Sequence, residues 1–114
     1  MIWGRLARAF RLVLDPRLKY VYEWAEDPPP VTRPGFVYLI GDQPKPWSAQ
    51  FICPCGCGDV ITLSLIENDN PRWRHAIHPL GSISLWPSVW RTKGCRSHFY
   101  IRNGKVLWAY PDDS

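Results

Sequence analysis

The chain has 114 residues, of which 46% are hydrophobic and 21% charged, a composition typical of one globular domain and unlike that of a disordered chain. No apolar run reaches the ~20 residues of a membrane-spanning helix, and the first residues lack the pattern of a secretory signal, so we expect a cytoplasmic protein. The net charge of +4 comes from residues 1–19, which hold five basic and one acidic side chain, so the rest of the chain is a poor match for a nucleic-acid-binding surface.

Residues 1–27 show the periodicity of a basic amphipathic helix. Apolar side chains recur at spacings of three and four, and arginines occupy the other faces. The spaced apolar residues are Ile2, Leu6, Phe10 and Val13. Asp15 before Pro16 is typical of an N-cap and a first helical turn, which predicts a second short helix. We expect a helical arm that packs on the rest of the protein; the alternative is an arm that docks on a membrane, an acidic partner or nucleic acid.

The prolines of residues 28–34 predict a stiff, extended linker. After it the chain breaks into short segments rich in β-branched and aromatic residues. These segments are 35–41, 49–53, 59–66, 72–78, 82–86, 98–102 and 105–110. Asn103-Gly104 joins the last two and is typical of a type I′ hairpin. We therefore expect a mainly β fold class, in which residues 35–114 form a small, mostly antiparallel domain that a zinc site clamps.

Four cysteines and one histidine form two groups with metal-ligand spacing. Cys53, Cys55 and Cys57 alternate along a glycine-rich turn, and Cys95 precedes His98 by three positions, which suits chelation. A reducing compartment favours a metal over disulfides, which would need very tight rings within the first group, and over free cysteines. The expected ion is Zn²⁺, which binds four nitrogen or sulfur ligands in a tetrahedron and would hold the turn against the last hairpin.

Five candidate ligands for four positions leave one residue over. We expect Cys55 to be that residue, because the two flanking cysteines can hold an ion from both sides of the turn. The alternative is that His98 faces elsewhere. The residue left over could be inert, lie beside the metal or be reactive. His75 and His78 are expected to be structural or surface histidines rather than ligands.

Three stretches of the chain resemble a family of small, largely uncharacterised bacterial proteins. Its pattern is a Cys-Pro-Cys-Gly-Cys-Gly turn, a Ser-Leu-x-Pro-Ser segment, and Cys-Arg-Ser-His followed by a hairpin and a closing Trp. Here the matches are residues 53–58, 84–88 and 95–108, so the resemblance covers about residues 35–110 and leaves out the N-terminal arm. The resemblance implies a zinc protein encoded beside ubiquitin-like proteins and E1- and E2-like enzymes, with a role in antiphage defence.

Candidate catalytic residues for a peptidase of such a pathway are Ser88, Ser97 and His98. A zinc hydrolase keeps an open position for water and a nearby acid, whereas a thiolate-rich site is closed, and Asp59 is the acid nearest the cysteines in sequence. A serine nucleophile needs an oriented base. His98 can be that base only if it does not bind zinc. A cysteine nucleophile stays open if one thiol is left over, and ordinary turn hydrogen bonding remains the alternative role for the serines.

Three functions are compatible with these features. The first is a zinc-containing peptidase (a hydrolase) that matures or deconjugates a ubiquitin-like modifier. The second is a non-catalytic zinc-stabilised adaptor or ligase-like module in the same pathway. The third is a nucleic-acid-binding zinc domain, which the neutral charge of residues 20–114 disfavours.

Overall fold

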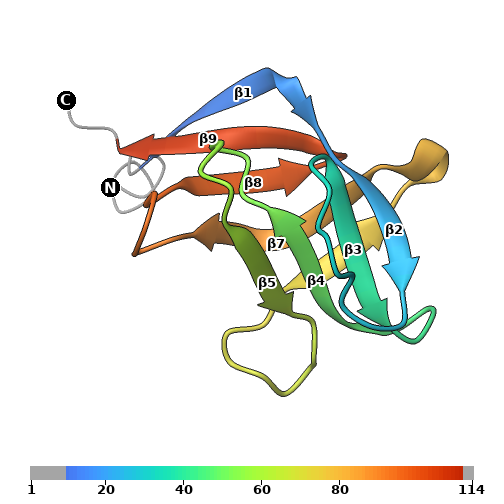
Figure 1. Cartoon of the computed structure of the whole chain (residues 1–114). Helices are drawn as coiled ribbons and strands as arrows, with labels where there is room; N and C mark the ends of the chain where they lie inside the picture. The colour runs from blue at the N-terminus through green and yellow to red at the C-terminus, as the bar shows by residue number, and fades with distance from the viewer. Residues whose placement is uncertain (1–9, 112–114) are drawn as a thin grey trace, which may run out of the picture.

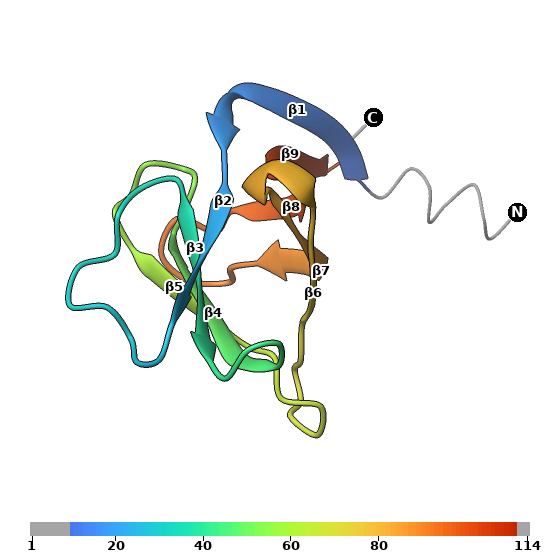
Figure 2. The same ribbon diagram turned by 90° about the vertical axis from the view of Figure 1, so that its right-hand side faces the viewer.

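The computed structural model describes residues 10–111, which fold into two facing β-sheets (Figure 1, Figure 2). One sheet has five strands in the order β1-β9-β8-β7-β6, and the other has four in the order β2-β3-β4-β5. Neighbouring strands run antiparallel except for the parallel pair β2 and β3. The elements are β1 Phe10–Lys19, β2 Val21–Ala25, β3 Phe36–Gly41, β4 Pro46–Ile52, β5 Val60–Ser64, β6 Arg74–Ile77, the 3-10 turn η1 Pro79–Gly81, β7 Ile83–Trp90, β8 His98–Arg102 and β9 Lys105–Pro111.

The core lies between the two sheets and is made of alternate side chains of the central strands. Leu39 and Phe51 come from the four-stranded sheet, and Leu85, Phe99 and Ile101 come from the five-stranded sheet; each is under 2% exposed. The rings of Phe51 and Phe99 meet edge to face across the interface, with centroids 6.3 Å apart. Because side chains alternate along a strand, the opposite face of β7 and β8 is free to carry polar residues.

Tyr20 joins the two sheets where the chain passes from β1 into β2 (Figure 1). Its ring packs against Phe51 with centroids 5.6 Å apart, and its hydroxyl donates to the Ile52 carbonyl at 2.6 Å. Its main-chain N–H donates to the Gly104 carbonyl at 2.7 Å. One buried residue therefore ties the turn between β8 and β9 to the strand that leads into the cysteine turn.

The predicted N-terminal helical arm is wrong for residues 10–25, which form the strands β1 and β2; residues 1–9 lie outside the described part of the chain. β1 pairs in antiparallel register with β9, from Arg11 opposite Tyr110 to Asp15 opposite Val106. An otherwise open edge of β9 therefore overrides the local helical periodicity, as tertiary pairing often does. The expected N-cap, Asp15, instead accepts hydrogen bonds at a shift in the strand register, from the Arg17 main-chain N–H at 3.1 Å.

The mainly β, mostly antiparallel fold is confirmed, and each predicted segment after residue 35 contains a strand. The hairpin between β8 and β9 turns at Asn103 and Gly104, whose φ angles of 50° and 76° are those of a type I′ turn. A Cβ atom at Gly104 would lie 2.5 Å from the Tyr20 carbonyl oxygen, so glycine is required there. Within residues 10–111, no helix is long and apolar enough to cross a membrane.

Candidate functional site

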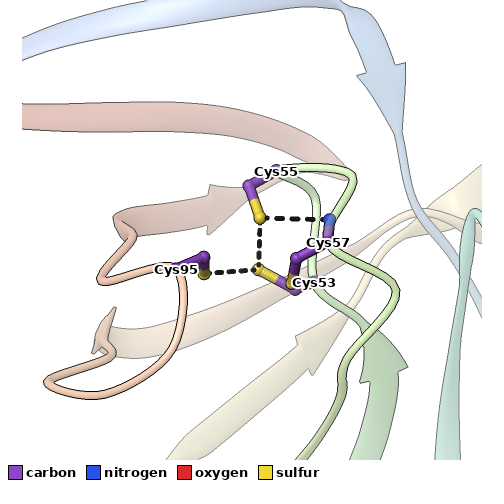
Figure 3. A group of neighbouring side chains, drawn as sticks. All are labelled: Cys53, Cys55, Cys57 and Cys95. Atoms are coloured by element: carbon purple, nitrogen blue, oxygen red, sulfur yellow. Dashed lines mark hydrogen bonds between the residues drawn. The ribbon is translucent and has the colours of Figure 1, made fainter.

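The four cysteines point toward one another where two loops meet (Figure 3). Cys53, Cys55 and Cys57 lie in the turn between β4 and β5, and Cys95 lies in the loop between β7 and β8. Their four sulfur atoms all lie within 4.8 Å of one another, and Cys53 Sγ is 3.5 Å from Cys55 Sγ and 3.6 Å from Cys95 Sγ. All four are free thiols, so this thiol cluster is not a disulfide framework.

The cysteine turn is shaped by its main chain. The Cys53 N–H donates to the Asp59 carbonyl at 2.9 Å, which closes the turn at its base. Gly56 and Gly58 have φ angles of 93° and 83°, in the left-handed region that glycine adopts without strain. The Cys57 N–H donates to Cys55 Sγ at 3.3 Å. Amide groups that point at sulfur are what a thiolate cluster needs, because they stabilise negative charge on the ligands.

The donor set and its dimensions fit a metal ion. A tetrahedron with metal–sulfur bonds of ~2.3 Å has sulfur–sulfur edges of about 3.8 Å, close to the separations in the cluster. Burial raises the pKa of Cys53 to about 12. Burial also acts to raise the pKa of Cys95, but hydrogen bonds from Ser97 and the other thiols outweigh it and lower this pKa to about 6. The structure brings Cys55, the residue expected to be left over, into the cluster, and it places His98 elsewhere.

Arg91 connects the thiol cluster to the strands. Its Nη1 lies 3.2 Å from Cys95 Sγ and 3.5 Å from Cys57 Sγ, and its Nη2 forms a 2.9 Å ion pair with Asp59. Its main-chain N–H donates to the Ser97 carbonyl at 2.8 Å, directly beside His98. This role has no signal in the sequence, since an arginine four residues before a cysteine matches no ligand spacing. Arg91 supplies positive charge to the sulfurs and holds both sides of the loop between β7 and β8.

Ser88 and His98 face each other across β7 and β8, just outside the thiol cluster. His98 Nε2 lies 2.8 Å from Ser88 Oγ, and His98 as a whole is 8% exposed. The contact depends on an irregular register: Leu85 pairs with Ile101 and Val89 with Phe99, so four steps along β7 face two along β8. That irregularity brings the hydroxyl of Ser88 to the ring of the first residue of β8.

The surroundings of His98 orient its imidazole and favour the uncharged form. The Trp90 indole stacks on the ring with centroids 4.4 Å apart and planes inclined by 5°, and Tyr100 lies 5.9 Å away. Burial lowers the pKa of His98 below its ordinary value. A neutral imidazole that contacts a hydroxyl through Nε2 can accept the hydroxyl proton, which is the task of a general base.

Ser88 is also fixed through its main chain. The Trp73 indole N–H donates to the Ser88 carbonyl at 3.2 Å, and the Trp73 main-chain N–H donates to the Ser64 carbonyl at 2.8 Å. Trp73 therefore reaches from the chain before β6 to the nucleophile candidate on β7. No sequence motif marks this residue, because the contact spans fifteen positions and depends on the pairing of β6 with β7.

The other serines have different surroundings. Ser97, the second candidate nucleophile, has its hydroxyl 3.1 Å from Cys95 Sγ, within the surroundings of the thiol cluster. Ser84 lies 2.8 Å from His78 Nε2, but it is 3% exposed and accepts the Asn103 main-chain N–H at 2.7 Å. His75 is half-buried beside Trp73. Of these groups, Ser88 with His98 has the arrangement that best suits nucleophilic chemistry.

A cavity of about 690 Å³ adjoins this site. Its walls include His98 and Ser97 from the β8 side, Cys55 and Cys95 from the thiol cluster, and Trp108 from β9. The Trp108 indole N–H donates to Asp15 Oδ2 at 3.0 Å, and hydrogen bonds from Arg17 and Trp108 hold the pKa of Asp15 well below its usual range. The cavity is large enough to accept a short stretch of an extended chain next to His98.

A family model described as "Bacterial ubiquitination-like system serine protease (BubE)" matches residues 24–109, more than half of the chain. The match spans the cysteine turn, Ser88 and His98. No curated protein and no solved structure matches the chain.

Proposed function

The chain belongs to the BubE family, the serine proteases of bacterial ubiquitination-like systems, and from this premise we propose that it is a protease whose nucleophile is Ser88 and whose general base is His98. The observation that carries the proposal is the 2.8 Å contact between Ser88 Oγ and His98 Nε2. It joins a hydroxyl to a neutral imidazole next to a cavity, the minimum arrangement for covalent catalysis by serine.

The reaction follows from the two side chains. Ser88 Oγ attacks the carbonyl carbon of the scissile bond, and His98 Nε2 takes the hydroxyl proton. The tetrahedral intermediate collapses when His98 returns this proton to the leaving amine nitrogen, which leaves an acyl group on Ser88. A water molecule then gives a proton to His98 and attacks the acyl carbon, and Ser88 Oγ departs and regains the proton. Trp73 holds the Ser88 main chain in place through these steps.

We assign the thiol cluster to Zn²⁺ with a structural role. Cys53, Cys55, Cys57 and Cys95 would provide all four ligands, so the ion would have no open position for water. When bound, the ion joins the cysteine turn to the loop between β7 and β8. Arg91 and the turn amides offset the negative charge of the thiolates. His98 then remains available as the base, which removes the conflict between its two expected roles.

The proposed substrate is the ubiquitin-like protein of the same system, cleaved in a precursor tail or at a conjugate bond. The family description supports this class of substrate, since it places the protease in a ubiquitination-like system. E1- and E2-like enzymes are the further partners that such a system implies. A role in antiphage defence would follow from the role of the whole system.

The test is incubation of the zinc-loaded protein with the system's ubiquitin-like precursor, followed by intact-mass spectrometry. We expect cleavage by the wild type and by Ser97→Ala, and none by Ser88→Ala. A fluorophosphonate probe should label the Ser88 hydroxyl, as peptide mapping would show. If the wild-type protein binds the precursor or an E2-like enzyme but cleaves neither precursor nor conjugate, the protease assignment fails and the adaptor function takes its place.

A further inference from the structure

A second cavity, of about 510 Å³, lies at the end of the five-stranded sheet away from Ser88. It is bordered by the last residue of β1, by η1 and by the turn between β8 and β9. The lining residues that matter here are Lys19, His78, Leu80, Ser82, Asn103 and Lys105, and no carboxylate is among the residues that line it. We call it the basic cavity.

Two lysines face each other in the basic cavity. Lys19 and Lys105 are cross-strand partners in the β1–β9 ladder, and both side chains are exposed. Like charges directly opposite each other destabilise a sheet pair. Within residues 10–111, no ion pair involves either lysine. An anionic group bound between them would turn this repulsion into attraction.

Leu80 stands beside these lysines and is fully exposed, at 103% of its reference area. Its φ of 76° lies in the left-handed region, which a leucine adopts only at a cost in energy. The turn is held by main-chain bonds from His78 N–H to Ser82 O at 3.0 Å and from Gly81 N–H to His78 O at 3.2 Å. The His78 ring is fixed in turn by Ser84 Oγ at 2.8 Å. The fold therefore presents an apolar side chain on a braced turn next to two unpaired positive charges.

The hydroxyl and imidazole of the basic cavity are both engaged within the protein, His78 with Ser84 and Ser82 with Asn103. The Ser82 hydroxyl donates to Asn103 Oδ1 at 2.5 Å. A free phosphate or other small anion would explain the lysines but not the exposed leucine. A protein surface with acidic side chains around an apolar one would match both features.

We propose that the basic cavity docks the folded body of the ubiquitin-like substrate while its tail reaches Ser88; this rests on the proposed function. Acidic side chains of the substrate pair with Lys19 and Lys105, and an apolar side chain covers Leu80. From Ile83 to Ser88 the chain runs along β7 for five residues, about 17 Å at ~3.3 Å per residue. An extended tail of about five or six residues spans the same distance. Docking at one end of the strand thus delivers the scissile bond to the other.

The test is a calorimetric titration of the system's ubiquitin-like protein into Ser88→Ala protein, which binds without cleaving. Reversing both lysines, Lys19→Glu with Lys105→Glu, should weaken binding roughly tenfold and reverse its salt dependence, because salt then screens a repulsion instead of an attraction. Leu80→Asn should weaken binding several-fold, because asparagine tolerates the left-handed backbone but lacks the apolar surface. Lys45→Glu, an exposed lysine between β3 and β4, is the matched control and should change nothing.

Unchanged affinity in the double-lysine variant would overturn the proposal. The proposal would also fail if inorganic phosphate blocked binding of the ubiquitin-like protein while Leu80→Asn bound that protein with normal affinity. That result would indicate a site for small anions. In the active protein, the lysine variant should raise KM for the intact substrate and leave cleavage of an isolated tail peptide unchanged. If the wild type cleaves nothing, only the protease function is contradicted. The titration still tests docking, because it measures binding by Ser88→Ala protein and does not depend on cleavage.

Discussion

Strand β7 carries two serines that each contact a histidine at 2.8 Å, and only one of the two pairs suits catalysis. Ser84 is buried at 3% exposure and contacts His78 at the edge of the basic cavity, and its hydroxyl also accepts the Asn103 main-chain N–H. Ser88 contacts His98 beside a cavity and is held through its own carbonyl by Trp73. The same serine–histidine distance thus occurs in a structural contact at Ser84 and in a candidate catalytic contact at Ser88. Burial and additional partners, rather than the contact itself, separate the two roles.

The largest expected difference between the pairs is in activity. Ser88→Ala should lower kcat by about 10⁴-fold or more, because removing a nucleophile leaves only binding and polar stabilisation. Ser84→Ala should keep activity within roughly tenfold, since its partners His78 and Asn103 do not line the cavity beside His98. Single-turnover cleavage of the ubiquitin-like precursor measures both. Equal losses of activity in the two variants would contradict the assignment of a catalytic role to Ser88 and a structural role to Ser84.

The second prediction concerns the metal, whose removal should affect the loop that joins Ser88 to His98. Removing Zn²⁺ with a chelator, or replacing the ligand in Cys95→Ser, should lower the melting midpoint by at least ~10 °C, because metal binding holds the two loops together. Activity should be lost with it, since Cys95 lies in the loop between Ser88 and His98. Differential scanning calorimetry with measured zinc content tests this. A melt that is indifferent to the chelator would contradict a structural site.

The third difference is in stability, where the pair of Ser84 and His78 should contribute more than the pair of Ser88 and His98. Ser84→Ala leaves the part-buried Asn103 N–H without its acceptor, which should reduce the free energy of unfolding by about 1–2 kcal/mol. Ser88→Ala should change it by less than ~1 kcal/mol. Urea unfolding of the zinc-loaded proteins measures both values. If Ser88→Ala were the more destabilising change, Ser88 would belong with the structural residues.

The pH profile should report on His98. Catalysis needs the neutral imidazole, and burial lowers the pKa of His98, so kcat/KM should stay level as pH falls until it passes a midpoint below the ordinary value of ~6.5. Zinc content must be measured across the same range, because acid also protonates thiolates. An acid limb centred at or above pH 7 would mean that another group, or a charged His98, controls the rate.

The smallest effect is expected at Trp73. Trp73→Phe keeps most of the ring but removes the N–H that binds the Ser88 carbonyl, so kcat should fall several-fold, equivalent to about 1 kcal/mol, with KM little changed. Trp24→Phe, on β2 of the other sheet, is the control for loss of an indole. A change in KM alone would assign Trp73 to substrate contact rather than to positioning of Ser88.

Local patterns predicted much of this structure, and non-local pairing accounts for what they missed. Alternation and turn residues located the strands after residue 35. The cysteine spacing identified the four thiols that cluster, although it also counted His98 and expected Cys55 to be left over. The helix expected near Asp15 fails because β9 offers an unpaired edge that the local sequence cannot reveal. Ser88 and His98 were both candidates, but their contact depends on the irregular register between Leu85 and Val89. Trp73 and Arg91 act through contacts that no spacing rule describes.

The short distance along the chain from Cys95 to His98 makes insertions here hard to accommodate. Two residues lie between Cys95 and His98, the first residue of β8: Arg96, with a left-handed φ of 55°, and Ser97, whose carbonyl accepts the Arg91 main-chain N–H. One added residue would shift the strand by one position, which turns its side chains to the opposite face, or would draw Cys95 away from the other sulfurs. The number of residues between Cys95 and His98 is therefore fixed by the structure, and relatives of this protein should accept insertions and deletions in other loops more readily than in this one.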